Sequence, residues 1–187
     1  MKRPELAPLI LVVGPSGAGK DTLLAGAAQA LTHRPRIVFA RRRVTRKTGG
    51  FGEDPSSPEE FAEVESSGGF LLSWHAHGLA YGVPASVQSL RETGSAVVVN
   101  VSRTVIGVAR RKVFPVGIIA VTAPVQTLAQ RLVDRGREDA EDIGRRLRRA
   151  EEDLPGGPDV RVVVNDGTVE AGVTAFLDAL EALTADI

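Results

Sequence analysis

A glycine-rich loop between an apolar run and a helical pattern constrains this chain more than any other sequence feature. Residues 9–13 are continuously apolar, which predicts a strand buried on both faces. Residues 14–20 satisfy the pattern G-x-x-x-x-G-K, and residues 21–31 carry apolar side chains at helical spacing. Glycines let successive backbone N–H groups turn inward around phosphate oxygens, and the helix dipole adds positive potential. The order strand, loop and helix therefore predicts a phosphate-binding loop.

The loop predicts a site for ATP, in which Lys20 reaches the β and γ phosphates. The expected nucleotide-binding residues are Gly14, Pro15, Ser16, Gly17, Ala18, Gly19, Lys20, Asp21 and Thr22. Position 21 departs from the pattern, because Asp21 stands where a Ser or Thr hydroxyl normally ligates Mg²⁺. We expect Asp21 to supply the charge of the metal site, directly or through water. In the alternatives, Thr22 substitutes for the missing hydroxyl, or Asp21 only favours the N-terminus of the helix.

The rest of the chain alternates short apolar runs with helical patterns. The runs lie at residues 37–40, 96–99, 116–121 and 160–164, and the helical patterns at 125–133, 142–153 and 169–183. This alternation predicts an α/β fold with a parallel sheet flanked by helices. A length of 187 residues suits one catalytic domain, residues 1–187, with room for a small lid.

Residues 41–90 depart from this alternation. The stretch is rich in Gly, Ser and Pro and carries only short apolar pieces. We interpret it as an insertion over the carboxyl edge of the sheet.

Composition narrows the classes of partner. Lys and Arg number 23 and are balanced by 23 Asp and Glu, so no overall basic excess favours nucleic acid. The chain has no cysteine, which excludes disulfides and thiolate metal sites. No apolar run approaches a membrane span, and the first residues lack a signal-peptide cleavage site. We expect a cytoplasmic protein without nucleic-acid or membrane partners. The sequence is compatible with a homodimer but does not establish one.

Beyond the loop, the chain resembles the guanylate kinases over nearly its whole length, and resembles their relatives the ribose 1,5-bisphosphate phosphokinases still more closely. The pieces that carry the resemblance are spread along the chain, at residues 14–21 (GPSGAGKD), 41–46 (RRRVTR), 59–61 (EEF), 74–82 (WHAHGLAYG), 100–103 (NVSR), 131–137 (RLVDRGR), 145–147 (RRL) and 164–167 (VNDG). The resemblance implies a P-loop NTPase three-layer sandwich with an acceptor-binding insertion at residues 41–90 and a helical lid at residues 135–146.

Departures from the guanylate kinase pattern bear on the acceptor. Leu72 stands where a guanylate kinase has a glutamate that reads guanine, and Val83 with Pro84 follows the Tyr-Gly pair where a hydroxyl residue is usual. Asn100 and Ser102 replace the two aspartates that serve Mg²⁺ and base recognition. A pocket without these groups has lost its means of discriminating a base. The resemblance therefore implies an acceptor without a base.

The insertion and the nearby sheet edge are rich in arginine, whose planar guanidinium grips phosphates bidentately. The cluster comprises Arg41, Arg42, Arg43, Arg46 and Arg103. It suits an acceptor with two phosphate groups, although single members of the trio 41–43 are as consistent with a solvated surface. Arg46 matches an arginine that binds the acceptor phosphate in guanylate kinases. The expected substrate-binding residues are Arg42, Arg46, Tyr81 and Arg103.

Further arginines match the nucleotide side and the lid of the family. The resemblance assigns Arg131 and Asn165 to the adenine side, and Arg135 and Arg146 to catalysis together with Lys20. It implies the ATP- and Mg²⁺-dependent phosphorylation of ribose 1,5-bisphosphate to 5-phosphoribosyl 1-diphosphate, which serves phosphonate breakdown and nucleotide supply. The alternatives are a guanylate kinase with a divergent pocket and a non-catalytic guanylate-kinase-like binding module.

Overall fold

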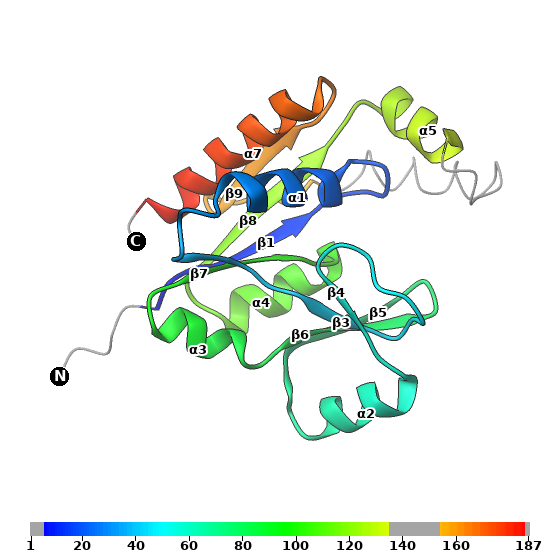
Figure 1. The fold of residues 1–187 in the computed structure, drawn as a ribbon, viewed down its shortest axis with the longest axis vertical. Coiled ribbons are helices and arrows are strands. Elements are labelled where there is room, and N and C mark those ends of the chain that lie inside the picture. Colours follow the sequence, from blue (N-terminus) through cyan, green and yellow to red (C-terminus); the bar gives the residue numbers. More distant parts are fainter. Residues whose placement is uncertain (1–5, 135–153, 186–187) are drawn as a thin grey trace.

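The computed structural model describes residues 6–134 and 154–185 and contains a five-stranded parallel sheet (Figure 1). Its strand order is β2-β7-β1-β8-β9, and every neighbouring pair is parallel. The strands are β1 (Leu9–Val13), β2 (Ile37–Phe39), β7 (Ala96–Asn100), β8 (Val116–Thr122) and β9 (Val160–Val164). These are the five apolar runs of the sequence, so the predicted α/β fold with a parallel sheet is confirmed.

Helices cover both faces of this sheet. On one side lie α1 (Lys20–Ala30) and α7 (Val169–Thr184), and on the other lie α3 (Val87–Glu92) and α4 (Ile106–Lys112), as Figure 1 shows. β1 is buried on both faces: Leu11 belongs to the cluster toward α4, and Val12 to the cluster toward α1 and α7. Burying each such side chain stabilises the fold by roughly 1.5–3 kcal/mol. The continuous apolar run of β1 follows from this two-sided burial.

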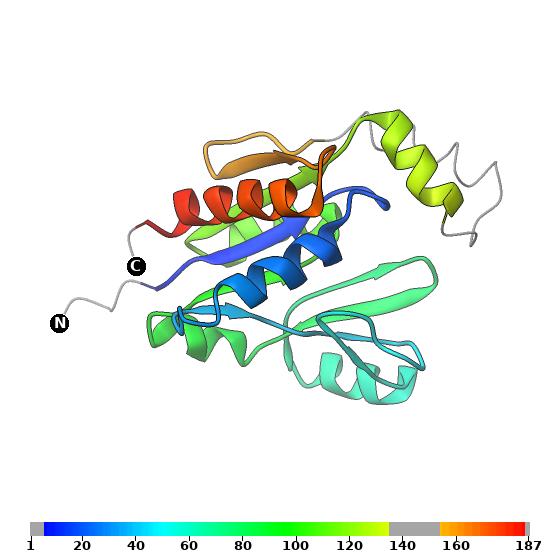
Figure 2. The same cartoon turned by 45° about the horizontal axis from the view of Figure 1, so that its top comes forward.

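The stretch that we interpreted as an insertion forms a second, four-stranded sheet of order β4-β3-β6-β5. Its elements are β3 (Arg42–Val44), β4 (Glu53–Pro55), α2 (Pro58–Ser66), β5 (Phe70–Ala76) and β6 (Leu79–Pro84). Sequence patterns missed this sheet, because β3 and β4 have three residues each and are mostly polar. Figure 2 shows the second sheet and α2 on the side of the molecule where the β1–α1 loop lies.

The remaining described elements are the 3₁₀ turn η1 (Arg103–Val105) and α5 (Val125–Asp134). α5 and α7 confirm two of the predicted helices. The helix predicted over residues 142–153 and the predicted lid at 135–146 lie outside the described residues, as do Arg135 and Arg146. Among the helices that the structure describes, none has the length and apolar character of a membrane span.

Candidate active site

The β1–α1 loop adopts a conformation that only glycine allows. Gly14, Gly17 and Gly19 have φ values of +147°, +87° and +85°, in the region that L side chains rarely enter. A Cβ atom on Gly14 would also lie 2.0 Å from the carbonyl oxygen of Val121 on β8. The predicted role of the glycines therefore has a geometric basis, because a side chain at these three positions would strain the backbone and at Gly14 would also clash with β8.

Lys20 lies over the loop at the start of α1. Its Nζ donates hydrogen bonds to the carbonyl oxygens of Gly14 at 2.8 Å and Pro15 at 2.9 Å. The ammonium is thereby held at the loop, beside the N-terminal turn of α1. This end of the helix carries the positive potential that phosphate groups require.

Asn165 and Arg131 contact the loop from its other side. Asn165 is 6 % exposed, and its Nδ2 donates to the carbonyl oxygen of Ala18 at 2.8 Å. Nη1 of Arg131 donates to the carbonyl oxygen of Gly17 at 3.3 Å. Both residues line a cavity of about 250 Å³ beside Gly17 and Gly19. The structure thus brings the two predicted adenine-side residues together, and it gives Asn165 the further task of fixing the loop.

A larger cavity of about 1120 Å³ connects the loop with the second sheet. Among its lining residues are loop members from Gly14 to Thr22, and also Arg42, Tyr81, Asn100, Ser102 and Arg103. Its volume exceeds the ~300–1,000 Å³ typical of single small-molecule sites, which suits two ligands side by side. The structure therefore brings predicted donor and acceptor residues to one space. His75 and His77 also line it, and neither was a predicted site residue.

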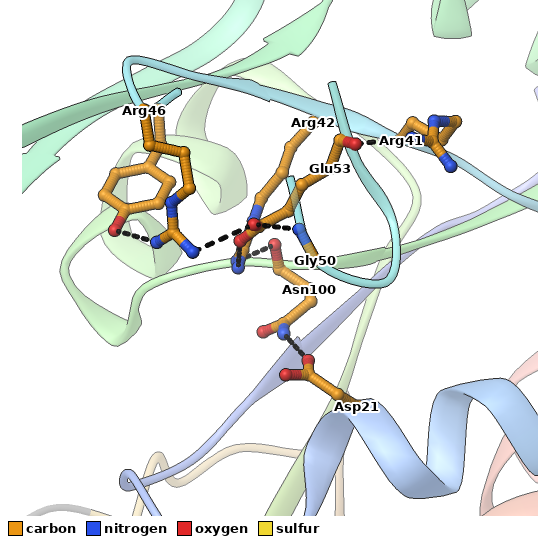
Figure 3. Close-up of polar contacts among 8 residues, drawn as sticks. Asp21, Arg41, Arg42, Arg46, Gly50, Glu53 and Asn100 are labelled. Atoms are coloured by element: carbon orange, nitrogen blue, oxygen red, sulfur yellow. Dashed lines mark hydrogen bonds and ion pairs between the residues drawn. The ribbon is translucent and has the colours of Figure 1, made fainter. Parts of the chain in front are cut away.

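Glu53 is a site residue that the sequence analysis missed. Its Oε1 lies 2.7 Å from Nη2 of Arg42, and its Oε2 lies 3.1 Å from Nη1 of Arg46 (Figure 3). Burial raises the pKa of Glu53, but the hydrogen bonds from Arg42 and Gly50 and the charges of Arg42 and Arg46 outweigh it and hold this pKa below its ordinary value. Two of the predicted phosphate-binding arginines thus share one buried anion.

The arginines of the cluster differ in their surroundings. Nε of Arg41 donates to Oδ1 of Asp54 at 2.6 Å, in an exposed ion pair at the edge of the second sheet. Arg103 begins η1 and lines the large cavity. Arg46 lies next to the cavity wall, where its Nη2 donates to the hydroxyl of Tyr81 at 3.3 Å. The sequence suggested one cationic patch. In the structure its members have different partners, since Arg41 pairs with Asp54 whereas Arg42 and Arg46 pair with Glu53.

Asp21 and Asn100 form the junction between the loop helix and the core sheet. Asn100 Nδ2 donates to Oδ1 of Asp21 at 2.9 Å, and the carbonyl oxygen of Asn100 accepts from Nη1 of Arg42 at 2.8 Å. Asp21 and Asn100 both line the large cavity, with Thr22 next to them. A carboxylate, an amide oxygen and a hydroxyl are the hard oxygen donors that Mg²⁺ prefers. The donor set at this junction therefore fits the metal.

Nearly the whole chain aligns with curated proteins that are named ribose 1,5-bisphosphate phosphokinases. The PhnN proteins of Acidiphilium cryptum and Agrobacterium fabrum are 48 % and 41 % identical, and the alignments cover 95 % and 92 % of this chain and 94 % and 96 % of theirs. A bifunctional ribose 1,5-bisphosphokinase-thymidine phosphorylase of Cupriavidus pinatubonensis is 48 % identical over 94 % of this chain. The chain spans only 29 % of that longer relative. No protein-family model matches the chain.

Solved structures with similar folds are also kinases. A guanylate kinase from Anaplasma phagocytophilum superimposes with a TM-score of 0.65 at 19 % identity, covering 96 % of this chain and 88 % of its own. A gluconokinase from Sinorhizobium meliloti superimposes with a TM-score of 0.56 at 18 % identity, covering 97 % of this chain and 96 % of its own. These likenesses concern the fold, which agrees with the P-loop sandwich expected from the sequence.

Proposed function

The chain belongs to the ribose 1,5-bisphosphate phosphokinase family, and we propose that it transfers the γ-phosphoryl group of ATP to ribose 1,5-bisphosphate. The product is 5-phosphoribosyl 1-diphosphate, and the reaction serves phosphonate breakdown and nucleotide supply. The single observation that carries the proposal, beyond membership, is the cavity shared by the phosphate-binding loop and the arginine-bearing second sheet.

ATP is the proposed donor, bound by residues 14–22. In this proposal Lys20 stabilises the charge that develops between the β and γ phosphates. Arg131 and Asn165, which line the smaller cavity, are proposed to face the base. Asp21, Thr22 and Asn100 are the residues that we propose to hold Mg²⁺, which neutralises phosphate charge when bound. Arg135 and Arg146 complete the proposed site from a lid at residues 135–146.

The acceptor is proposed to bind on the second sheet, which forms the acceptor-binding insertion of residues 41–90. Arg42, Arg46, Tyr81 and Arg103 are its proposed contacts, and Arg42, Tyr81 and Arg103 line the large cavity. An acceptor phosphate oxygen is already largely anionic near neutral pH, so the transfer requires positioning and charge neutralisation more than a general base.

The absence of base-reading groups supports an acceptor without a base. Leu72 and Val83 stand where guanylate kinases have polar readers, and they face each other across β5 and β6. Leu72 is 3 % exposed and Val83 is fully buried, so both belong to the apolar core of the second sheet. An apolar pair at these positions offers no hydrogen bond to guanine and gives no means of selecting it.

Coupled measurement of ADP release tests the proposal, with ribose 1,5-bisphosphate and GMP offered side by side. We expect turnover of ribose 1,5-bisphosphate and hardly any turnover of GMP. Comparable rates would identify a guanylate kinase with a divergent pocket, and no ATP consumption with either would identify a binding module. The cytoplasmic location and the oligomeric state stay predictions from the sequence.

A further inference from the structure

We propose that Glu53 is a positioning residue, whose carboxylate orients Arg46 toward the acceptor and Arg42 toward the core sheet. The proposal rests on the proposed function, because it names how the acceptor site of that reaction is kept in place. It is drawn from the contacts of one buried carboxylate that joins two arginines with different tasks.

The surroundings of Glu53 are built to hold its carboxylate in one place. Its side chain is 5 % exposed, and Oε2 accepts a hydrogen bond from the backbone N–H of Gly50 at 2.9 Å. Glu53 is also the register partner of Arg42 in the parallel pair β3–β4. The β3–β4 loop is close to it, since a Cβ atom on Gly49 would lie 2.7 Å from the Glu53 carbonyl oxygen. These contacts and the burial of its side chain restrict the carboxylate to one position.

Arg42 uses its contact with Glu53 to join the two sheets. Its side chain is 14 % exposed, with Nη2 on Glu53 and Nη1 on the carbonyl oxygen of Asn100 at the end of β7. The side chain of Asn100 in turn donates to Asp21 in the first turn of α1. Figure 3 shows this sequence of contacts from Glu53 to Asp21. The rate of phosphoryl transfer depends on the distance between donor and acceptor. These hydrogen bonds between the second sheet and the core sheet therefore affect the rate, because they set the position of the acceptor site relative to the loop.

Arg46 is the more accessible of the two arginines. Its side chain is 36 % exposed, Nη1 contacts Glu53 at 3.1 Å, and Nη2 contacts the Tyr81 hydroxyl, which belongs to the cavity wall. Within the described part of the chain, the buried Nε atoms of Arg42 and Arg46 have no hydrogen-bond partner. Two guanidinium groups this close to one buried site repel each other and lose hydration, so the charge of Glu53 stabilises both of them.

The single tryptophan of the chain gives a direct readout of acceptor binding. Trp74 stacks on Tyr81, with ring centroids 5.3 Å apart and an interplanar angle of 6°. The fluorescence of Trp74 is titrated with ribose 1,5-bisphosphate in the presence of MgADP, which fills the loop. The variants are Glu53→Gln, Arg46→Ala and the double variant. Asp54→Asn is the matched control, since it removes the neighbouring carboxylate that pairs with Arg41 at the surface.

We expect Glu53→Gln to raise the Kd for the acceptor about tenfold or more, the effect of weakening charge-assisted hydrogen bonds at a buried site. In the Arg46→Ala background the same change should raise the acceptor Kd by less than about a further twofold, because Glu53 acts on acceptor binding through Arg46, whereas its contact with Arg42 affects the rate. The Kd for MgADP should stay near the wild-type value in every variant. The Asp54→Asn variant should also bind the acceptor with a Kd near that of the wild type. Circular dichroism checks the fold, and Glu53→Asp, which keeps the charge but shortens the reach, replaces Glu53→Gln if that variant does not fold.

Several results would overturn the proposal. The first is a folded Glu53→Gln protein with the wild-type acceptor Kd. The second is a rise in acceptor Kd on Glu53→Gln that is equal in the wild-type and Arg46→Ala backgrounds. The third is a rise in acceptor Kd in Asp54→Asn that equals the rise in Glu53→Gln. Failure of the proposed function has a different signature, because the wild-type protein would then neither bind nor phosphorylate ribose 1,5-bisphosphate. In that case the same comparison of the wild type with these variants, with inorganic phosphate as the probe, decides whether Glu53 positions Arg46 for a phosphate group.

Discussion

The side-chain amide of Asn100 donates a hydrogen bond to Oδ1 of Asp21 over 2.9 Å, across 79 positions of sequence. The pair joins the carboxyl end of β7 to the first turn of α1. Both positions carry residues unusual for a P-loop kinase, and the structure places them in contact. The two departures from the sequence pattern are therefore one structural feature.

Replacing Asp21 by Ala tests the metal role of this pair. If the carboxylate supplies the charge of the Mg²⁺ site, Asp21→Ala raises the Mg²⁺ concentration required for half-maximal rate, and adding Asn100→Asp recovers part of the loss. The measurement is the initial rate as a function of Mg²⁺ at saturating ATP. If Asp21 only favours the helix N-terminus, the variant loses roughly 0.3–1 kcal/mol of stability, and its Mg²⁺ dependence is unchanged.

Lys20→Met should lower turnover by about 10²-fold or more while the protein stays folded. The ammonium lies within 2.9 Å of two loop carbonyl oxygens. In the proposed reaction it stabilises the charge that develops between the β and γ phosphates. Steady-state kinetics with ribose 1,5-bisphosphate gives the loss, and the circular dichroism spectrum gives the control. A folded variant with a near-normal rate would mean that the loop has only a structural task.

Asn165→Asp should weaken ATP binding and destabilise the protein. The substitution keeps the shape but replaces the amide that donates to the carbonyl oxygen of Ala18 with an acceptor. An unpaired polar group at this buried position should lower the free energy of unfolding by roughly 1–3 kcal/mol. Urea unfolding measures this loss. The KM for ATP should rise as the loop loosens. Asp166→Asn, at the next and exposed position, is the control and should change neither quantity.

The contribution of Glu53 to stability should depend on pH in a defined direction. Its pKa in the folded protein lies below the ordinary value of 4.5, because Arg42, Gly50 and Arg46 together favour the charged form over the effect of burial. The stabilisation is therefore complete above pH 4.5 and is lost as the pH falls through the folded-state pKa. The stability difference between wild type and Glu53→Gln, from urea unfolding, should shrink below pH 4.5. A difference that is constant from neutral to acidic pH would contradict this account.

Local sequence was enough to predict the core sheet and the loop. The central strands β1, β7 and β8 are almost wholly apolar, because a strand covered on both faces has to be apolar along its length. The edge strands β2 and β9 are less buried, but their short runs, rich in valine or isoleucine, were still recognisable. The loop was equally evident, since Gly14, Gly17 and Gly19 occupy backbone conformations that other residues avoid. Burial and backbone sterics act on neighbouring residues, so they leave a pattern that can be read in one segment.

The second sheet and the polar contacts of the site were decided by the tertiary structure. β3 and β4 are three-residue polar strands that exist because β6 and each other supply their hydrogen-bond partners. Glu53 has no local signal, and its role arises from two arginines on another strand and the loop after it. The Asn100–Asp21 bond depends on parallel strands ending at the same edge as the loop. Contacts between distant segments have no periodicity in sequence, which is why only the fold reveals them.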